Sequence, residues 1–234
     1  MVRVLKWTGL TLLALVLLFL GYLAYRLVPA DDPRPLPPDL ISAESEEGAG
    51  LLQSATAKDD YEELAENFEA QKLTSFCGVA SSVVTLKSLG RDVTQTSVFN
   101  EKASNVRPIW QVAVGGMTID IFAKILEANG AKVVLHRPGP EGLETFREAV
   151  ERNLSTDADY LLVNYQRQVL GQDQVGHISP LAAYDKESDR VLVMDTAAYK
   201  YPFTWVPLID LYRAMEATDP ETGKSRGWVE VSDT

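Results

Sequence analysis

The spacing of apolar residues changes along this chain, from a helical period in the first half to continuous apolar runs in the second. Apolar residues three or four positions apart predict helices over residues 59–70, 77–89, 117–130, 141–154 and 207–215. Continuous apolar runs predict strands over residues 131–136, 159–166, 177–185, 190–199 and 227–232. Helices precede most of the strands, an order typical of the α+β class with an antiparallel sheet.

An uncharged apolar stretch, residues 7–25, stands near the start of the chain. A helix over these residues would rise about 28 Å, enough to cross the hydrocarbon core of a bilayer. Arg3 and Lys6 precede it, which indicates a cytoplasmic N-terminus and a periplasmic, extracytoplasmic globular part. We therefore predict a membrane signal-anchor over residues 1–27. A cleaved signal peptide is the alternative, but its apolar region should be shorter and end at a small-residue site.

Composition separates this anchor from a globular domain. Residues 28–56 hold five prolines and then an acidic run of small residues, which predicts a linker without a core. Residues 57–234 then form one domain of ordinary size. The formal net charge of −11 argues against a nucleic-acid partner, because phosphate binding needs a basic surface. One cysteine and two histidines are too few for a structural zinc site, and we predict no metal ligand.

The single cysteine, Cys77, stands in the run QKLTSFCGVASS at the predicted start of a helix. A free cysteine is often a small buried core residue. At a helix N-terminus, however, the partial positive charge favours the thiolate, which is the nucleophilic form. Cys77 is therefore a candidate nucleophile.

His177 and Asp195 are candidate partners of this thiol. The polar run DKESD, residues 185–189, predicts a hairpin between the strands that carry them. Because the hairpin folds back near residue 187, His177 and Asp195 should lie side by side, where the carboxylate can fix the tautomer of the imidazole. The other histidine, His136, is interpreted as an ordinary strand residue.

Gln71 precedes Cys77 by six residues, within reach of the place where an oxyanion would form. Its amide and the backbone N–H of Cys77 could act as the two donors of an oxyanion hole. A glutamine, a cysteine, a histidine and an aspartate in this chain order form a constellation of the papain type.

Four stretches resemble the catalytic domain of phytochelatin synthases and their short bacterial relatives, which are papain-fold thiol acyltransferases. They are SFCGVASSVVTLKSLG, VNYQRQVLGQDQVGHISPLAAYD, VLVMDTAAYKYPFTWVPL and LYRAMEATDPETGKSRGWV. The resemblance implies a papain-like cysteine protease fold, with the catalytic Cys77 on a helix and an antiparallel sheet carrying His177 and Asp195. It also implies Gln71 as the oxyanion-hole residue.

The same resemblance implies that Asp219 and Arg226 hold the amino and carboxylate ends of a γ-glutamyl group. One charge of each sign suits such a zwitterionic end, and we expect both residues at the mouth of the site. Plant members commonly have arginine where Ala198 stands, so the resemblance does not extend to a second-substrate contact there. The sequence also holds no counterpart of their Cys-rich C-terminal half, which is tied to the heavy-metal response.

The implied function is cleavage of the Cys–Gly amide of glutathione through a γ-Glu-Cys thioester on Cys77. The products are γ-Glu-Cys and, with glutathione as acceptor, phytochelatins used in metal detoxification. No cofactor is bound directly, and Cd or Zn ions enter as metal–thiolate complexes of the substrate. A membrane-tethered papain-like peptidase is the alternative, although a peptidase has no need of a γ-glutamyl clamp. A non-catalytic binder of thiol peptides is a third hypothesis, which does not require a nucleophile and a base.

Overall fold

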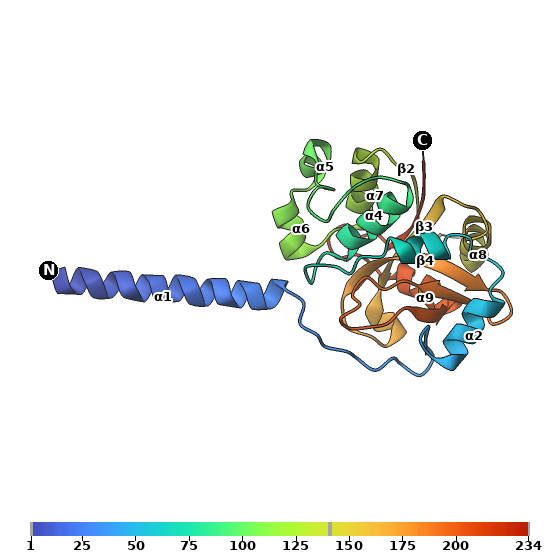
Figure 1. Ribbon diagram of the computed structural model, residues 1–234, viewed down its shortest axis with the longest axis horizontal. Coiled ribbons are helices and arrows are strands. Elements are labelled where there is room, and N and C mark those ends of the chain that lie inside the picture. The colour runs from blue at the N-terminus through green and yellow to red at the C-terminus, as the bar shows by residue number, and fades with distance from the viewer. Residues whose placement is uncertain (1, 140–141, 234) are drawn as a thin grey trace.

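The computed structural model describes residues 2–139 and 142–233, and it shows an antiparallel sheet between two layers of helices (Figure 1). Within this part of the chain the sheet has seven strands in the order β1-β6-β5-β4-β3-β7-β2, with each neighbouring pair antiparallel. The strands are β1 (Ile41–Ser42), β2 (Lys132–His136), β3 (Asp159–Gln166), β4 (Gly176–Asp185), β5 (Arg190–Val193), β6 (Thr204–Pro207) and β7 (Gly227–Ser232).

The helices stand mostly before the central strands in the sequence. They are α1 (Val2–Leu27), α2 (Glu46–Ser54), α3 (Tyr61–Glu66), α4 (Cys77–Ser88), α5 (Glu101–Val106), α6 (Ile109–Gly115), α7 (Ile119–Ala128), α8 (Gly142–Asn153) and α9 (Leu208–Glu216), with a short 3-10 helix η1 (Arg167–Leu170) after β3. This order confirms the predicted α+β class, with a helical N-terminal part and an antiparallel sheet.

Two apolar cores explain why the strands read as continuous apolar runs. On β3, Leu162 packs on one face with residues of α4 and α7, whereas Leu161 and Val163 pack on the other face with residues of α8 and α9. Successive side chains of a strand point to opposite faces. Because both faces of β3 are covered, neither set of positions needs to be polar.

Short-range sequence patterns agree with several helix and strand boundaries of the structure. Strands β3 and β7 have the predicted bounds, and α4 ends just before Gly90, which adopts a left-handed conformation with φ +74°. Thr118 caps α7 by accepting a hydrogen bond from the backbone N–H of Ile121. The predicted helix 141–154 corresponds to α8, and its first residue, Glu141, lies outside the described residues, as do Met1 and Thr234.

Part of the predicted linker is folded onto the domain. The structure forms β1 and α2 within residues 41–54, and Ser45 caps α2 through a hydrogen bond from the Gly48 N–H. The indole of Trp205 donates a hydrogen bond to the Gly48 carbonyl across 3.0 Å. Gly48 also lets α2 lie close to the backbone that follows β1, because a Cβ on Gly48 would lie 2.8 Å from the Cα of Ala43.

The predicted membrane anchor and the extracytoplasmic placement that depended on it are wrong. Among the described residues, no helix combines the length and the apolar character that crossing a bilayer requires. Figure 1 shows α1 extending away from the domain.

Candidate active site

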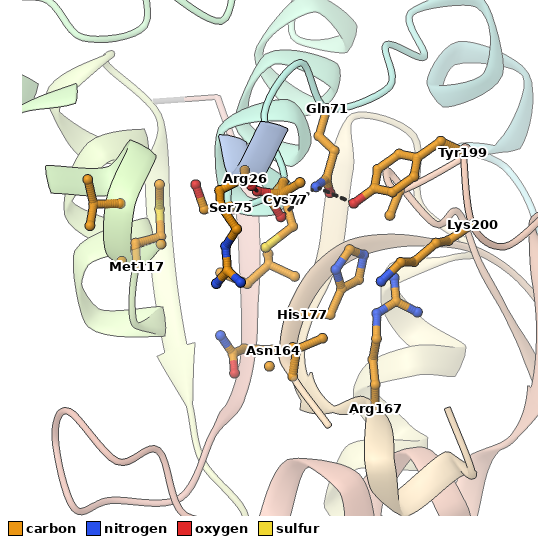
Figure 2. Close-up of a pocket in the computed structure, with 18 of the residues that line it drawn as sticks. Arg26, Gln71, Ser75, Cys77, Met117, Asn164, Arg167, His177, Tyr199 and Lys200 are labelled. Atoms are coloured by element: carbon orange, nitrogen blue, oxygen red, sulfur yellow. Dashed lines mark hydrogen bonds between the residues drawn. The ribbon is translucent and has the colours of Figure 1, made fainter. Parts of the chain in front are cut away.

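A cavity of about 850 Å³ brings the predicted site residues together. The N-terminal end of α4 borders it on the helical side, and the ends of β3, β4 and β7 border it on the sheet side (Figure 2). Five of the predicted residues line it, namely Gln71, Cys77, His177, Asp219 and Arg226. The sixth, Asp195, lies behind His177 in contact with its ring.

Cys77 is the first residue of α4, and its side chain is half-buried at the cavity. Its backbone N–H has no intrahelical acceptor, because the first N–H groups of a helix lack one. Ser81 holds α4 against the strand of His177 by donating a hydrogen bond to the Ile178 carbonyl across 3.0 Å. Gly78 permits this approach, since a Cβ there would lie only 3.2 Å from the Cδ1 atom of Ile178.

The predicted hairpin brings His177 and Asp195 together. Strands β4 and β5 pair antiparallel, and the chain leaves β5 after Val193, so that Asp195 lies beyond the strand end. The His177 Nε2 atom lies 3.0 Å from Asp195 Oδ1. At this distance the carboxylate of Asp195 favours the charged form of the imidazole.

Arg167, which sequence reasoning missed, is the closest partner of Asp195. Its Nη2 lies 2.7 Å from the carboxylate, and its side chain is 2% exposed. Tyr201 packs against the guanidinium, with its ring centroid 5.0 Å away. The only signal in the sequence is an arginine directly after the apolar strand 159–166. Its counter-ion lies 28 residues further along, which no local pattern indicates.

Opposing effects set the protonation of the cysteine–histidine pair. Burial would raise the pKa of Cys77, but the hydrogen bond and charge of His177 outweigh it and lower that pKa below its ordinary value. For His177, burial and the charge of Arg167 lower the pKa, while Asp195 and Cys77 raise it more, so the net pKa is raised. Burial would raise the pKa of Asp195, yet Arg167 and His177 hold it well below its usual range. These directions favour a thiolate beside an imidazolium.

Gln71 lies in the cavity with its amide already engaged. Its Nε2 donates to the carbonyls of Leu73 and Thr74, at 3.0 Å and 2.9 Å, and lies 3.5 Å from the Tyr199 hydroxyl (Figure 2). The Gln71 Oε1 atom is buried without a described hydrogen-bond partner. Donation to an oxyanion would therefore require Gln71 to exchange one of its backbone contacts.

Asp219 and Arg226 form a buried pair, contrary to the expectation that they lie at the mouth of the site. Their side chains are 11% and 7% exposed, and Arg226 Nη1 lies 3.4 Å from Asp219 Oδ2. Asn164, another residue that the sequence reasoning missed, accepts a hydrogen bond from the same Nη1 at 2.8 Å. Burial lowers the pKa of Arg226, and the charge of Asp219 opposes that effect. Burial follows from the fold, because Arg226 directly precedes β7 and its guanidinium lies against Gly176, the first residue of β4.

His136 lies apart from this cavity, on the edge strand β2. Its ring stacks on Trp228 with centroids 5.1 Å apart, and its Nε2 lies 3.2 Å from Glu230 Oε1. It does not line the cavity. Its position fits the interpretation of an ordinary strand residue.

The sequence of the chain is similar to those of several known proteins. The family model for phytochelatin synthase matches residues 32–228. Glutathione gamma-glutamylcysteinyltransferases 2 and 1 of Arabidopsis thaliana are 33% and 32% identical to the chain, covering 85% of it and 46% and 43% of their own lengths. The glutathione gamma-glutamylcysteinyltransferase of Schizosaccharomyces pombe is 25% identical, covering 84% of the chain and 50% of its own length. The chain spans about half the length of the curated relatives it matches.

Proposed function

We propose, on the premise that the chain belongs to the phytochelatin synthase family, that it is a thiol acyltransferase and hydrolase acting on glutathione. The observation that carries the proposal is the shared cavity of a cysteine–histidine pair and a buried Asp219–Arg226 pair. The first supplies a nucleophile and a proton donor, and the second offers one charge of each sign to a zwitterionic γ-glutamyl end. A papain-like fold, with Cys77 on a helix packed against a sheet that carries His177, is part of this proposal.

The proposed reaction begins with attack of the Cys77 thiolate on the carbonyl carbon of the Cys–Gly amide. The imidazolium of His177 gives its proton to the leaving glycine amine as the C–N bond breaks, and a γ-Glu-Cys thioester remains on Cys77. Asp195, held in place by Arg167, stabilises the imidazolium. The backbone N–H of Cys77 and the amide of Gln71 are the proposed donors to the oxyanion.

Two acceptors can complete the proposed cycle. Water, deprotonated by His177, releases γ-Glu-Cys and restores the thiolate. The amine of a second glutathione instead gives a peptide lengthened by one γ-Glu-Cys unit. Heavy-metal ions such as Cd²⁺ or Zn²⁺ would act through the thiols of the acceptor peptide, because soft thiolates bind these metals well.

Mass spectrometry of the products tests the proposal. Full-length protein with glutathione, with and without Cd²⁺, should release one glycine for each γ-Glu-Cys unit formed or transferred. The Cys77→Ala variant should release none, because it lacks the attacking sulfur. A papain-like peptidase is the competing function. Cleavage of an ordinary α-linked peptide at a higher kcat/KM than glutathione would contradict the acyltransferase proposal.

A further inference from the structure

Residues 25–34, here called the strap, form one wall of the active-site cavity. Six strap residues line the same cavity as Cys77 and His177, namely Tyr25, Arg26, Val28, Ala30, Asp32 and Arg34. The family model matches only from residue 32 onward. Most of this wall therefore comes from a segment outside the region that the family model matches.

Backbone hydrogen bonds hold the strap at both ends. Toward its start, the Thr74 N–H donates to the Leu27 carbonyl at 2.9 Å, and the Thr74 hydroxyl donates to the Arg26 carbonyl at 3.0 Å. Toward its end, the Asp32 N–H donates to the Tyr199 carbonyl at 3.0 Å. Thr74 belongs to the loop that leads into Cys77, and Tyr199 to the loop that follows Asp195. The strap thus bridges the two loops that carry the nucleophile and the acid.

Arg26 differs from the other cationic residues of the cavity. The other lysine and arginine side chains that line it each have a carboxylate partner, in the pairs Arg34–Asp32, Arg167–Asp195, Lys200–Asp173 and Arg226–Asp219. Among the residues that the structure describes, no carboxylate lies within ion-pair distance of Arg26. Figure 2 shows the Arg26 side chain in the cavity with Ser75 and Cys77. A guanidinium in such a place has its donors available for a carboxylate.

We propose that Arg26 binds the C-terminal glycine carboxylate of glutathione and so forms a leaving-group subsite. This inference rests on the proposed function. Glutathione carries two carboxylates, and the one at the γ-glutamyl end faces Arg226 in that function. The other belongs to the glycine, one residue beyond the amide that Cys77 attacks. Because an extended residue spans about 3.5 Å, its counter-charge must stand close to Cys77, where Thr74 holds Arg26.

The subsite makes the enzyme selective for a free C-terminal carboxylate. A glutathione whose glycine is amidated lacks the charge that Arg26 would bind, and a longer peptide places that charge further away. The product γ-Glu-Cys bears its new carboxylate at the reacting carbon and has no glycine, so it does not fill the subsite. Arg26 is accordingly a specificity-determining residue that takes no part in bond breaking.

The test compares two substrates and three full-length proteins. The substrates are glutathione and its glycinamide analogue, and the proteins are wild type, Arg26→Ala and Arg213→Ala. Arg213 is a control, an exposed arginine of α9 paired with Asp210 and absent from the cavity lining. Wild type should prefer the free acid by roughly 10- to 150-fold in kcat/KM, as expected for a hydrogen bond to a charged group. Arg26→Ala should lose this preference, mainly through a higher KM for glutathione, and keep the wild-type rate on the amide.

The two kinds of failure give different results. If wild type releases glycine but Arg26→Ala lowers kcat/KM by the same factor on both substrates, the subsite is overturned and the proposed function stands. Binding to the Cys77→Ala background by calorimetry needs no turnover and tests Arg26 even if glycine is not released. Equal affinities for glutathione with and without Arg26→Ala would refute the subsite. If Arg26→Ala weakens binding only of an analogue that keeps just the γ-glutamyl carboxylate, Arg26 binds that end of the substrate, and the glycine subsite is also overturned.

Discussion

Two buried arginine–aspartate pairs flank the cavity, and they differ in how fully their hydrogen bonds are used. In the first pair, Arg167 lies 2.7 Å from Asp195, both side chains are 2% exposed, and the Ala197 N–H adds a further bond to the carboxylate. In the second, Arg226 lies 3.4 Å from Asp219. The Arg226 Nε atom has no described hydrogen-bond partner. The polar atoms of the first pair are fully hydrogen-bonded, which suits a positioning role. The second pair keeps a free hydrogen-bond donor for a ligand.

The largest effect is expected from breaking the first pair. Arg167→Ala would leave the Asp195 carboxylate buried without its main counter-charge, which typically costs about 3–5 kcal/mol of unfolding free energy. Glycine release should also fall sharply, because Asp195 would no longer be held beside His177. Chemical denaturation and kcat/KM measure the two effects. An Arg167→Ala protein with unchanged stability would show that the pair is not the structural element described above.

A smaller effect is expected from the second pair. Arg226→Ala should lower kcat/KM for glutathione by roughly 10- to 150-fold, as the loss of a hydrogen bond to a charged group predicts. Iodoacetamide labelling of Cys77 should keep its wild-type rate. If labelling and turnover fall together, Arg226 supports the nucleophile and does not bind substrate.

Gly176→Ala tests the same pair without removing a charge. A Cβ at this position would overlap the Arg226 guanidinium, which must then move. The kcat/KM for glutathione should fall in the same direction as in Arg226→Ala, while iodoacetamide labelling stays unchanged. Gly50→Ala is the matched control, because no atom lies within 4 Å of a Cβ built there.

A third buried aspartate, Asp60, shows what happens without an arginine. It is 1% exposed, and both carboxylate oxygens lack a described hydrogen-bond partner. Burial first, and then the negative charges of Asp159 and Asp157, raise its pKa to about 8. Because the folded-state pKa of Asp60 is raised, its protonated carboxyl contributes fully to the free energy of unfolding below the unfolded-state pKa of about 4. This contribution is lost as the pH rises through about 8.

Asp60→Asn should remove that pH dependence. The variant should match wild type near pH 4 and exceed it by about 1–3 kcal/mol in unfolding free energy above pH 8, because an amide needs no ionisation. Denaturant titrations at both pH values provide the measurement. A constant difference between the variants across this range would contradict the pKa of Asp60.

The smallest effect concerns the pH profile of Cys77. The lowered pKa of Cys77 predicts that iodoacetamide alkylates it at a lower pH than it alkylates an ordinary thiol. The raised pKa of His177 predicts that its imidazolium is lost only above about pH 6.5. Asp195→Asn should lower the pKa of His177 and shift the upper limb of kcat/KM to lower pH, because the neutral amide no longer stabilises the imidazolium. Asp219→Asn should leave both limbs unchanged, which separates the roles of the two aspartates.

The sequence predicted those parts of the fold that depend on short-range patterns. Strands β3 and β7 have the bounds that their apolar runs predict, because such runs act within a few positions. The small, acidic residues of segment 41–54 predict a linker, because they bury little surface by themselves. It folds because β1 pairs with β6 and Trp205 bonds to Gly48, and both contacts span more than a hundred residues.

What the sequence alone determined is the set of reactive groups and their order. One cysteine before a helix, and a histidine and an aspartate on either side of a hairpin, were identifiable because helix starts and hairpins are local. Only the tertiary structure decided which charges meet. It paired Arg167 with Asp195, buried Arg226 against Gly176 and placed Arg26 in the cavity wall. The physical reason is that ion pairs depend on distance in space, and residues 26 and 77, or 167 and 195, become neighbours only when the helices pack against the sheet.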